Sequence, residues 1–138
     1  MRKRMIAGWG LAAVALSGCM PAEMPGQRDG RALFLSYCAE CHGATAEGNG
    51  PLARALETAP KNLTLISVRQ GNRFPRAEIL STIDGYARSD AAGPGMPEFG
   101  ELLEGDLVPL DTGDGRMTPT PRKLVALLEY LESIQAGR

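Results

Sequence analysis

The chain has 138 residues, enough for one domain with a modest core. Its 17 glycines and 10 prolines exceed what a bundle of long helices tolerates, so the composition favours short helices joined by loops. The formal net charge is −1, and it becomes −4 if the three cations of residues 2–4 are removed with a leader segment. A mildly acidic chain of this kind is not expected to bind nucleic acid.

A targeting segment precedes the domain. Residues 2–4 are Arg-Lys-Arg, and residues 5–16 form an apolar run that is too short to span a bilayer. The run ends in Leu-Ser-Gly-Cys, with the cysteine at position 19. This pattern resembles the lipobox of bacterial lipoproteins, in which the chain is cleaved before the cysteine and the cysteine carries fatty acyl chains. An ordinary signal peptide or an uncleaved membrane anchor is the alternative.

The resemblance to a lipobox implies three segments. Residues 1–18 would be a signal peptide that is removed, and residues 19–27 an irregular tether after a lipidated Cys19. The folded domain would occupy residues 28–138. Acyl chains on Cys19 would hold the protein on a membrane of the cell envelope, facing the periplasm.

The first predicted helix begins at about Gly30, where Asp29 can act as its N-cap. Gly30, Phe34, Cys38 and Cys41 recur at helical spacing, so they share one face of this helix. A glycine on that face permits the close approach of another helix.

The segment Cys38-Ala39-Glu40-Cys41-His42 places two cysteines three residues apart and a histidine directly after the second. This C-x-x-C-H spacing lets both thiols form thioethers with the two vinyl groups of one haem, while the imidazole reaches the iron. The alternatives are a thioredoxin-like redox pair, a disulfide or half of a zinc site. A redox pair needs a strand–helix context that is missing, and the other half of a zinc site is absent from the sequence. We therefore expect one covalently bound haem c, with its iron held by His42.

Two short helices are predicted in the middle of the chain. Residues 63–69 are rich in β-branched side chains but have no nearby partner strand, so a short helix is preferred. Pro75 opens the second helix, which has apolar residues at Ile79 and Ile83 on one face and a stop signal at Gly85.

The loop over residues 86–99 carries Gly-Pro-Gly-Met-Pro at positions 93–97 and supplies a candidate second ligand for the iron. His42 is the single histidine, so ligation by two histidines is excluded. Methionine is the natural alternative, because a thioether favours ferrous iron and raises the reduction potential. Met96 is preferred over Met117, since the glycines beside Met96 let the backbone approach the haem and the following proline fixes the chain.

Charge is distributed unevenly around this loop. Residues 90–114 include seven acidic side chains and no basic one, whereas residues 61–76 include four basic side chains and no acidic one. A solvated surface is the plain interpretation, and a dipolar surface that orients the protein toward a redox partner is the functional one. Residues 111–115, Asp-Thr-Gly-Asp-Gly, fail the spacing of an EF-hand, so we expect a plain turn.

The last predicted helix begins at Thr120-Pro121, with threonine at the cap and proline at the first helical position. Gly137 can terminate it. The apolar stripe of this helix is formed by Leu124, Leu127, Leu128, Leu131 and Ile134.

Gly30 and Phe34 on the first helix, with Leu127 and Tyr130 on the last, match by type and spacing the two crossing helices of class I cytochromes c. The chain resembles this family over nearly all of residues 28–138. The resemblance implies an all-α fold of short helices and loops wrapped around one covalently bound haem.

The same resemblance implies a role for the loop over residues 43–62. In the family, a proline carbonyl in this loop accepts a hydrogen bond from the axial histidine and fixes which ring nitrogen meets the iron. Pro60 is the preferred candidate, and Pro51 is the alternative.

The function implied is the transfer of single electrons by a membrane-anchored protein with His42 and Met96 as iron ligands. A redox protein or a membrane respiratory complex would be the electron donor and acceptor, and no small-molecule substrate would be transformed. Two alternatives remain: a cytochrome subunit of a larger oxidoreductase complex, or a haem-based gas sensor if the methionine ligand is labile.

Overall fold

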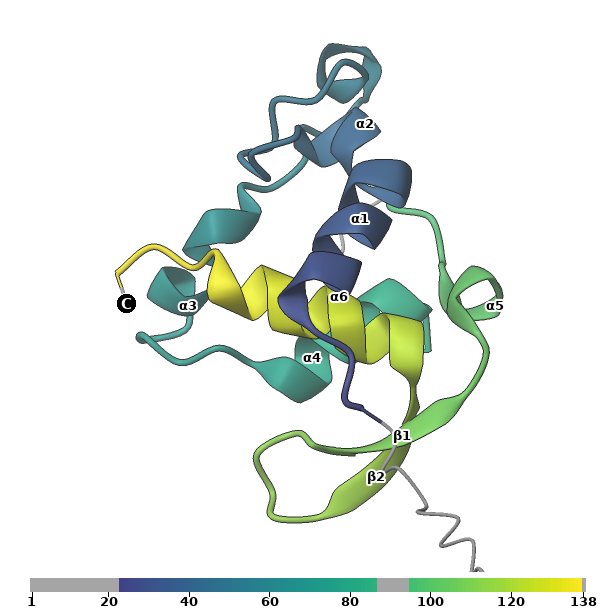
Figure 1. The fold of residues 1–138 in the computed structure, drawn as a ribbon. Helices are drawn as coiled ribbons and strands as arrows, with labels where there is room; N and C mark the ends of the chain where they lie inside the picture. The colour runs from purple at the N-terminus through teal and green to yellow at the C-terminus, as the bar shows by residue number, and fades with distance from the viewer. Residues whose placement is uncertain (1–22, 87–94, 138) are drawn as a thin grey trace, which may run out of the picture.

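The computed structural model describes residues 23–86 and 95–137, and helices dominate these ranges (Figure 1). This confirms the expected all-α class, while the β1–β2 hairpin was not expected from the sequence. The elements in chain order are α1 (Gln27–Tyr37), α2 (Ala39–His42), the 3₁₀ turns η1 (Ala53–Ala55) and η2 (Leu63–Leu65), α3 (Ile66–Arg69), α4 (Arg76–Asp84), α5 (Gly100–Leu103), β1 (Leu107–Asp111), β2 (Met117–Pro121) and α6 (Arg122–Ser133).

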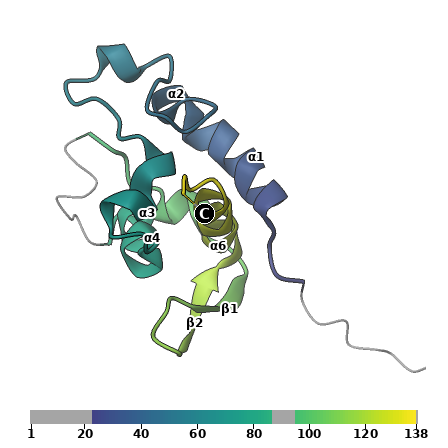
Figure 2. The same cartoon turned by 90° about the vertical axis from the view of Figure 1, so that its left-hand side faces the viewer.

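The crossing of α1 and α6 organises the fold. At the crossing, Gly30 lies so close to α6 that a Cβ at this position would collide with the backbone carbonyl of Ala126. Next to it, the fully buried ring of Phe34 packs on Tyr130, with 5.3 Å between the ring centroids. The predicted crossing of the first and last helices is therefore present. Figure 2 shows α6 between α1 on one side and α3 and α4 on the other.

Helix α1 begins slightly earlier than predicted, and Asp29 is not its N-cap. The N-cap is Gly26, and the backbone N–H of Gly26 donates a hydrogen bond of 3.3 Å to the carboxylate of Asp29. Asp29 therefore stands in the first turn of the helix, where its negative charge complements the helix dipole. Pro25, just before the cap, is buried against the domain.

The two predicted short helices are present. Residues 63–69 form η2 followed by α3, and the side-chain oxygen of Asn62 caps η2 by accepting from the backbone N–H of Thr64 at 2.9 Å. Helix α4 follows Pro75 and ends at Gly85, whose φ of 89° is the left-handed conformation that glycine adopts most readily.

Two sets of polar contacts fasten α3 and α4 to α6. The guanidinium of Arg76 on α4 pairs with the carboxylates of Glu129 and Glu132 on α6. Beyond the end of α6, the buried side chain of Gln135 accepts from the backbone N–H of Ser67 at 2.9 Å and donates to the carbonyl of Leu63 at 2.9 Å. The C-terminal segment is thereby joined to η2 and α3.

The β1–β2 hairpin is antiparallel and pairs Leu107 with Pro121 and Asp111 with Met117. Its inner face carries the buried side chains of Val108 and Leu110, which belong to the main core. The turn is closed by the carboxylate of Asp111, which accepts from the backbone N–H of Gly113 at 2.8 Å and of Gly115 at 3.0 Å. Residues 111–115 thus form a plain turn, as expected.

The start of α6 differs from the prediction. Thr120 belongs to β2 and Pro121 is the residue before the helix, so Thr120 does not cap it. The hydroxyl of Thr120 instead donates to the carbonyl of Thr118 at 3.0 Å, and the strand continues into the helix. The backbone N–H of Arg122 donates to the carbonyl of Asp106 at 2.8 Å, which extends the pairing of the hairpin by one residue.

Candidate functional site

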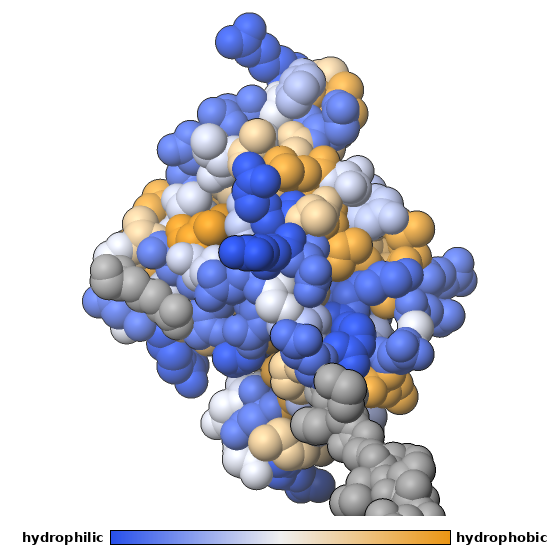
Figure 3. All heavy atoms as spheres, viewed as in Figure 1, coloured by the Kyte–Doolittle hydropathy of each residue, from blue (hydrophilic) through white to orange (hydrophobic). Residues whose placement is uncertain are grey.

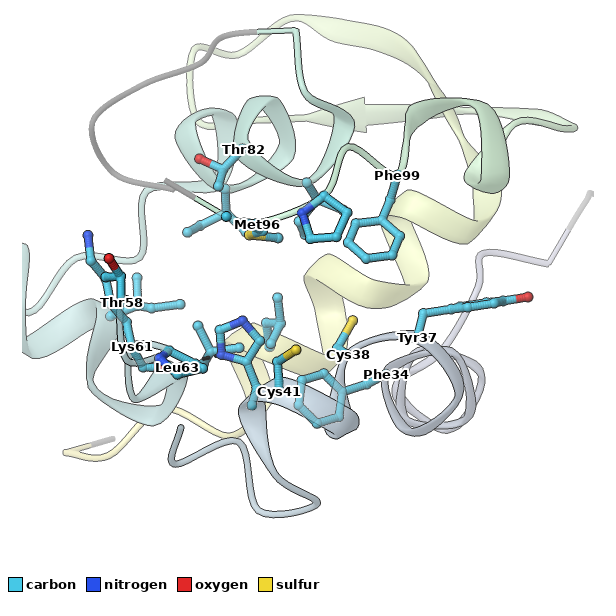
Figure 4. Close-up of a pocket in the computed structure, with 18 of the residues that line it drawn as sticks. Phe34, Tyr37, Cys38, Cys41, Thr58, Lys61, Leu63, Thr82, Met96 and Phe99 are labelled. Carbon is cyan, nitrogen blue, oxygen red and sulfur yellow. Dashed lines mark hydrogen bonds between the residues drawn. The ribbon is translucent and has the colours of Figure 1, made fainter. Parts of the chain in front are cut away.

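A cavity of about 520 Å³ lies between the α1–α2 segment on one side and α4 with residues 95–99 on the other. Its volume falls in the range of small-molecule and cofactor sites. Four of the residues predicted to form a site line it together: Cys38, Cys41, His42 and Met96. Figure 4 shows Met96 projecting into the cavity from the side opposite Cys38 and Cys41.

The two cysteines stand where α1 passes into α2. Cys38 is the last residue before α2, and its carbonyl accepts the backbone N–H groups of Cys41 at 3.2 Å and His42 at 2.9 Å. This turn brings both half-buried thiols to the same side of the chain, and no disulfide joins them. Burial, together with a smaller contribution from the charge of Cys41, raises the pKa of the Cys38 thiol to about 11. Both sulfurs are positioned to bond to one planar group in the cavity.

The imidazole of His42 is held by the backbone of a distant loop. Its Nδ1 lies 3.1 Å from the carbonyl oxygen of Lys61. A carbonyl can only accept, so Nδ1 carries the proton and Nε2 keeps a free lone pair. Burial lowers the pKa of His42 below its ordinary value, and the hydrogen bond to Lys61 opposes part of that shift. The result is a neutral imidazole that can ligate a metal through Nε2.

The acceptor of this hydrogen bond is therefore Lys61 and not Pro60, the residue that was predicted. Pro60 does line the cavity, but its carbonyl is directed at Gly48, where a Cβ would collide with it. Because consecutive carbonyls in an extended chain point in different directions, the next one, at Lys61, faces His42. Pro51, the alternative candidate, does not fill this role either.

The loop over residues 43–62 is tied to the end of α2 by its own backbone. The N–H groups of Gly48, Gly50 and Leu52 donate to the carbonyls of His42, Cys41 and Glu40 at 2.7, 3.1 and 2.9 Å. These bonds satisfy carbonyls that a short helix leaves without partners at its C-terminal end. The same bonds fix the position of the loop that carries the carbonyl acceptor.

The two candidate methionine ligands of the iron differ in where their side chains lie. Met96 is partly buried against the core and lines the cavity, whereas Met117 lies on β2 with 70% of its side chain exposed. The chain returning from the loop is fixed by the backbone N–H of Phe99, which donates to the carbonyl of Ile83 at 3.0 Å. The rest of the predicted ligand loop, residues 87–94, lies outside the described residues.

Several residues of the site were missed by the sequence analysis. The Lys61 carbonyl is one, and no side-chain pattern announces it because any residue supplies a carbonyl. The apolar walls of the cavity are others, and they include Tyr37, Ile79, Phe99 and Leu131. Tyr37 could have been noticed, because it directly precedes the first cysteine of the motif.

These residues fit a haem. Two thiols one helical turn apart, a neutral imidazole with a free Nε2, and a thioether on the far side form the donor set of a c-type site. The surrounding apolar walls suit a porphyrin ring. In the described part of the chain no cluster of three or more histidine, cysteine or carboxylate side chains forms a different metal site.

The family model described as cytochrome c oxidase, cbb3-type, subunit III matches residues 25–108. The chain belongs to this family. The match includes the two cysteines, His42 and Met96, and ends inside β1. As a cytochrome c domain of this family, the protein carries haem c with its iron and transfers electrons.

A relative of this cytochrome c domain is the polyvinylalcohol dehydrogenase of Sphingopyxis sp. (strain 113P3). The two are 33% identical over 121 residues, which is 80% of this chain but only 18% of the relative. The chain thus spans less than a fifth of that protein's length. No solved structure matches the cytochrome c domain.

Proposed function

We propose that the protein is a single-haem electron carrier of the class I type, anchored to a membrane by lipid. The observation that carries this proposal is the meeting of Cys38, Cys41, His42 and Met96 around one apolar cavity. The two thiols attach the haem through thioethers, and the imidazole and the thioether sulfur ligate its iron. The bound haem supplies a one-electron iron couple, and no substrate is transformed.

The residues around the two cysteines, His42 and Met96 would adjust the reduction potential of the bound haem. The Lys61 carbonyl holds the His42 ring in one orientation and makes its Nε2 a better donor. The apolar side chains of Phe99, Leu127 and Leu131 exclude water from the cavity. A dry site with a thioether ligand stabilises the ferrous state and so raises the reduction potential.

The proposed location follows from the lipobox-like sequence that ends at Cys19. After cleavage before Cys19, acyl chains would hold the domain on a membrane, and the domain would face the periplasm. Within the described part of the chain, no helix has the length and apolar character needed to cross a bilayer.

A second function is favoured by the dehydrogenase relative, which matches this cytochrome c domain over a small part of its length. In this version the protein is the cytochrome subunit of an oxidoreductase and receives electrons from a separate catalytic chain. The chemistry at the haem is the same in both versions, and only the lifetime of the contact with the partner differs. Purification from native membranes under mild conditions separates them, because a subunit stays with its catalytic chain in fixed proportion and a mobile carrier does not.

The experiment that tests the haem assignment is mass spectrometry of protein produced with a c-type maturation system. The mass should exceed that of the processed chain by one haem, and acid–organic extraction should not remove it. Cys38→Ser and Cys41→Ser should each leave one thioether and shift the reduced absorbance spectrum. A redox titration should fit a single one-electron step. Haem that is released by extraction from the wild type contradicts the covalent attachment.

A further inference from the structure

The hairpin end of the molecule is where the proposed lipid anchor emerges. The backbone carbonyl of Glu23 accepts a hydrogen bond from the guanidinium of Arg122, at the start of α6. Arg122 also joins Asp106 through its backbone N–H, and Leu107 follows directly in β1. Glu23 is four positions after Cys19 in the sequence, and four residue steps reach at most about 14 Å. A membrane that holds Cys19 therefore lies close to the hairpin.

The outer face of the hairpin is apolar. The strand register places Leu107, Pro109, Asp111, Met117, Pro119 and Pro121 on this face, opposite the inner Val108 and Leu110 that pack into the core. The side chains of Leu107 and Met117 are 62% and 70% exposed. In the one acidic member, Asp111, the carboxylate oxygen Oδ1 accepts from the backbone N–H groups of Gly113 and Gly115.

The backbone of the hairpin is also suited to an apolar neighbour. The backbone N–H of Arg122 donates to the carbonyl of Asp106, which sets the alternation of hydrogen bonds along the antiparallel ladder. By this alternation, the backbone nitrogens of residues 107, 109, 111, 117, 119 and 121 point away from the partner strand, toward the two edges of the hairpin. Three of these six residues are prolines and have no N–H. The edges therefore expose fewer unpaired donors whose desolvation would oppose contact with lipid.

Another exposed apolar side chain lies at the same end. Met24 directly follows Glu23 and is 47% exposed. In Figure 3, orange and pale orange atoms lie among blue ones at the lower end of the molecule. Residues 106–123 contain three acidic and three basic side chains, so charge gives this surface no net attraction to a membrane.

We propose that the outer face of the β1–β2 hairpin, with Leu107 and Met117 at its two ends, rests on the lipid surface to which Cys19 is anchored. The apolar side chains enter the boundary between headgroups and acyl chains. This orientation rests on the lipid anchor of the proposed function. It holds α2 and its cysteines at the end of the molecule away from the bilayer, because α2 and the hairpin lie at opposite ends in both views (Figures 1 and 2). The redox partner would then meet the haem from the aqueous side.

The test is hydroxyl-radical footprinting of the lipidated holoprotein, read by mass spectrometry. The protein is reconstituted in vesicles of phosphatidylethanolamine and phosphatidylglycerol at about three to one, and compared with Cys19→Ser protein mixed with the same vesicles. Labelling of Leu107 and Met117 should fall by about fivefold on anchoring, while labelling of Leu52 and Val68, which are 48% and 49% exposed elsewhere, should stay within about twofold. Protection should persist in about 1 M salt, where the Debye length is about 3 Å, because it does not depend on charge.

A matched pair of variants sharpens this test. Leu107→Glu with Met117→Glu should restore labelling of Pro109 and Pro119 to the level of the unanchored protein, whereas Leu52→Glu should leave their protection unchanged. All three positions are exposed, and the absorbance spectrum of the bound haem reports that each variant is folded.

Four results overturn the proposal. Equal labelling of the hairpin in anchored and unanchored protein means that the domain stands free of the bilayer. Protection of Leu52 instead means that the opposite end faces the lipid. Protection of the hairpin in native membranes but not in pure lipid vesicles means that its partner is a protein. Wild-type protein that does not float with vesicles lacks the anchor, and a one-electron redox titration of the same sample then shows whether the electron-carrier function still stands.

Discussion

The α-carbon of Gly30 lies against the backbone carbonyl of Ala126, at the point where α1 crosses α6. Both partners are main-chain atoms within helices, so neither can turn aside to admit a larger group. The crossing also fixes the direction in which α1 continues into the cysteines of α2, and it forms one wall of the haem cavity through Phe34 and Leu127. The geometry of the site therefore depends on this contact.

Gly30→Val is expected to lower the free energy of unfolding of the holoprotein by about 3 kcal/mol, because overpacking here must displace a helix backbone. The measurement is denaturant unfolding followed by helical circular dichroism. Gly26→Ala is the matched control, since a Cβ at Gly26 meets nothing within 4 Å, and its effect should stay below about 1 kcal/mol. Similar losses in the two variants would contradict a specific contact at Gly30.

Met96→Ala and Met117→Ala distinguish the two candidate ligands. Met96→Ala should abolish the far-red charge-transfer band of the oxidised protein, lower the reduction potential and allow carbon monoxide to bind the reduced iron. Met117→Ala should change none of these, because its side chain is 70% exposed on β2. The absorbance spectra of both variants and a potentiometric titration supply the measurement. If Met117→Ala removes the band instead, the assignment of the second ligand is wrong.

Gln135→Met is expected to lower the free energy of unfolding by about 3 kcal/mol, because it leaves the buried N–H of Ser67 and the carbonyl of Leu63 without partners. Hydrogen exchange at the Ser67 amide should quicken in the same variant. Gln27→Met, at an exposed position on α1, is the control and should change stability by less than about 0.5 kcal/mol. Unchanged exchange at Ser67 would mean that this contact is dispensable.

The acidic side chains beside the ligand loop are expected to steer charged partners. Changing Glu98, Glu101 and Glu104 to glutamine should slow electron transfer to a cationic ruthenium hexaammine probe by about threefold at low salt. The reduction potential should change little, because these side chains are exposed to solvent. Stopped-flow rates over a range of ionic strength supply the measurement, and the difference should fade when the Debye length reaches about 8 Å.

The control for this experiment is a variant that carries Glu23→Gln and Glu47→Gln. Both positions are exposed and acidic, and both lie outside the acidic segment of residues 90–114. The rate of this variant with the same probe should change by less than about twofold. Rates that are independent of salt in every variant would show that the acidic segment only keeps the protein soluble.

What the sequence predicted correctly depends on contacts between near neighbours. The spacing of Cys38 and Cys41 places both thiols together whatever the rest of the chain does, since one helical turn is enough. Helix α4 likewise follows from Pro75 and Gly85, which restrict the backbone at its two ends. The crossing of α1 and α6 is a long-range contact, but a small residue on one apolar face indicates it.

What the sequence did not predict depends on orientation and on distant packing. The hairpin contains three prolines within its two strands, and proline normally argues against a strand. It is stable because its inner face packs on the core and its prolines stand where no ladder hydrogen bond is needed. The choice between the carbonyls of Pro60 and Lys61 depends on the rotation of a single peptide plane, which Gly48 and the loop around it determine.

The hydrogen bond from His42 to Lys61 has a consequence for how this protein can change over evolutionary time. Its acceptor is a main-chain oxygen, so replacing the lysine side chain at position 61 does not remove it. Selection can therefore vary the charge at this edge of the haem cavity while the orientation of the iron ligand is inherited unchanged. Insertions or deletions between Gly43 and Asn62 have no such freedom, because they would move the peptide plane itself.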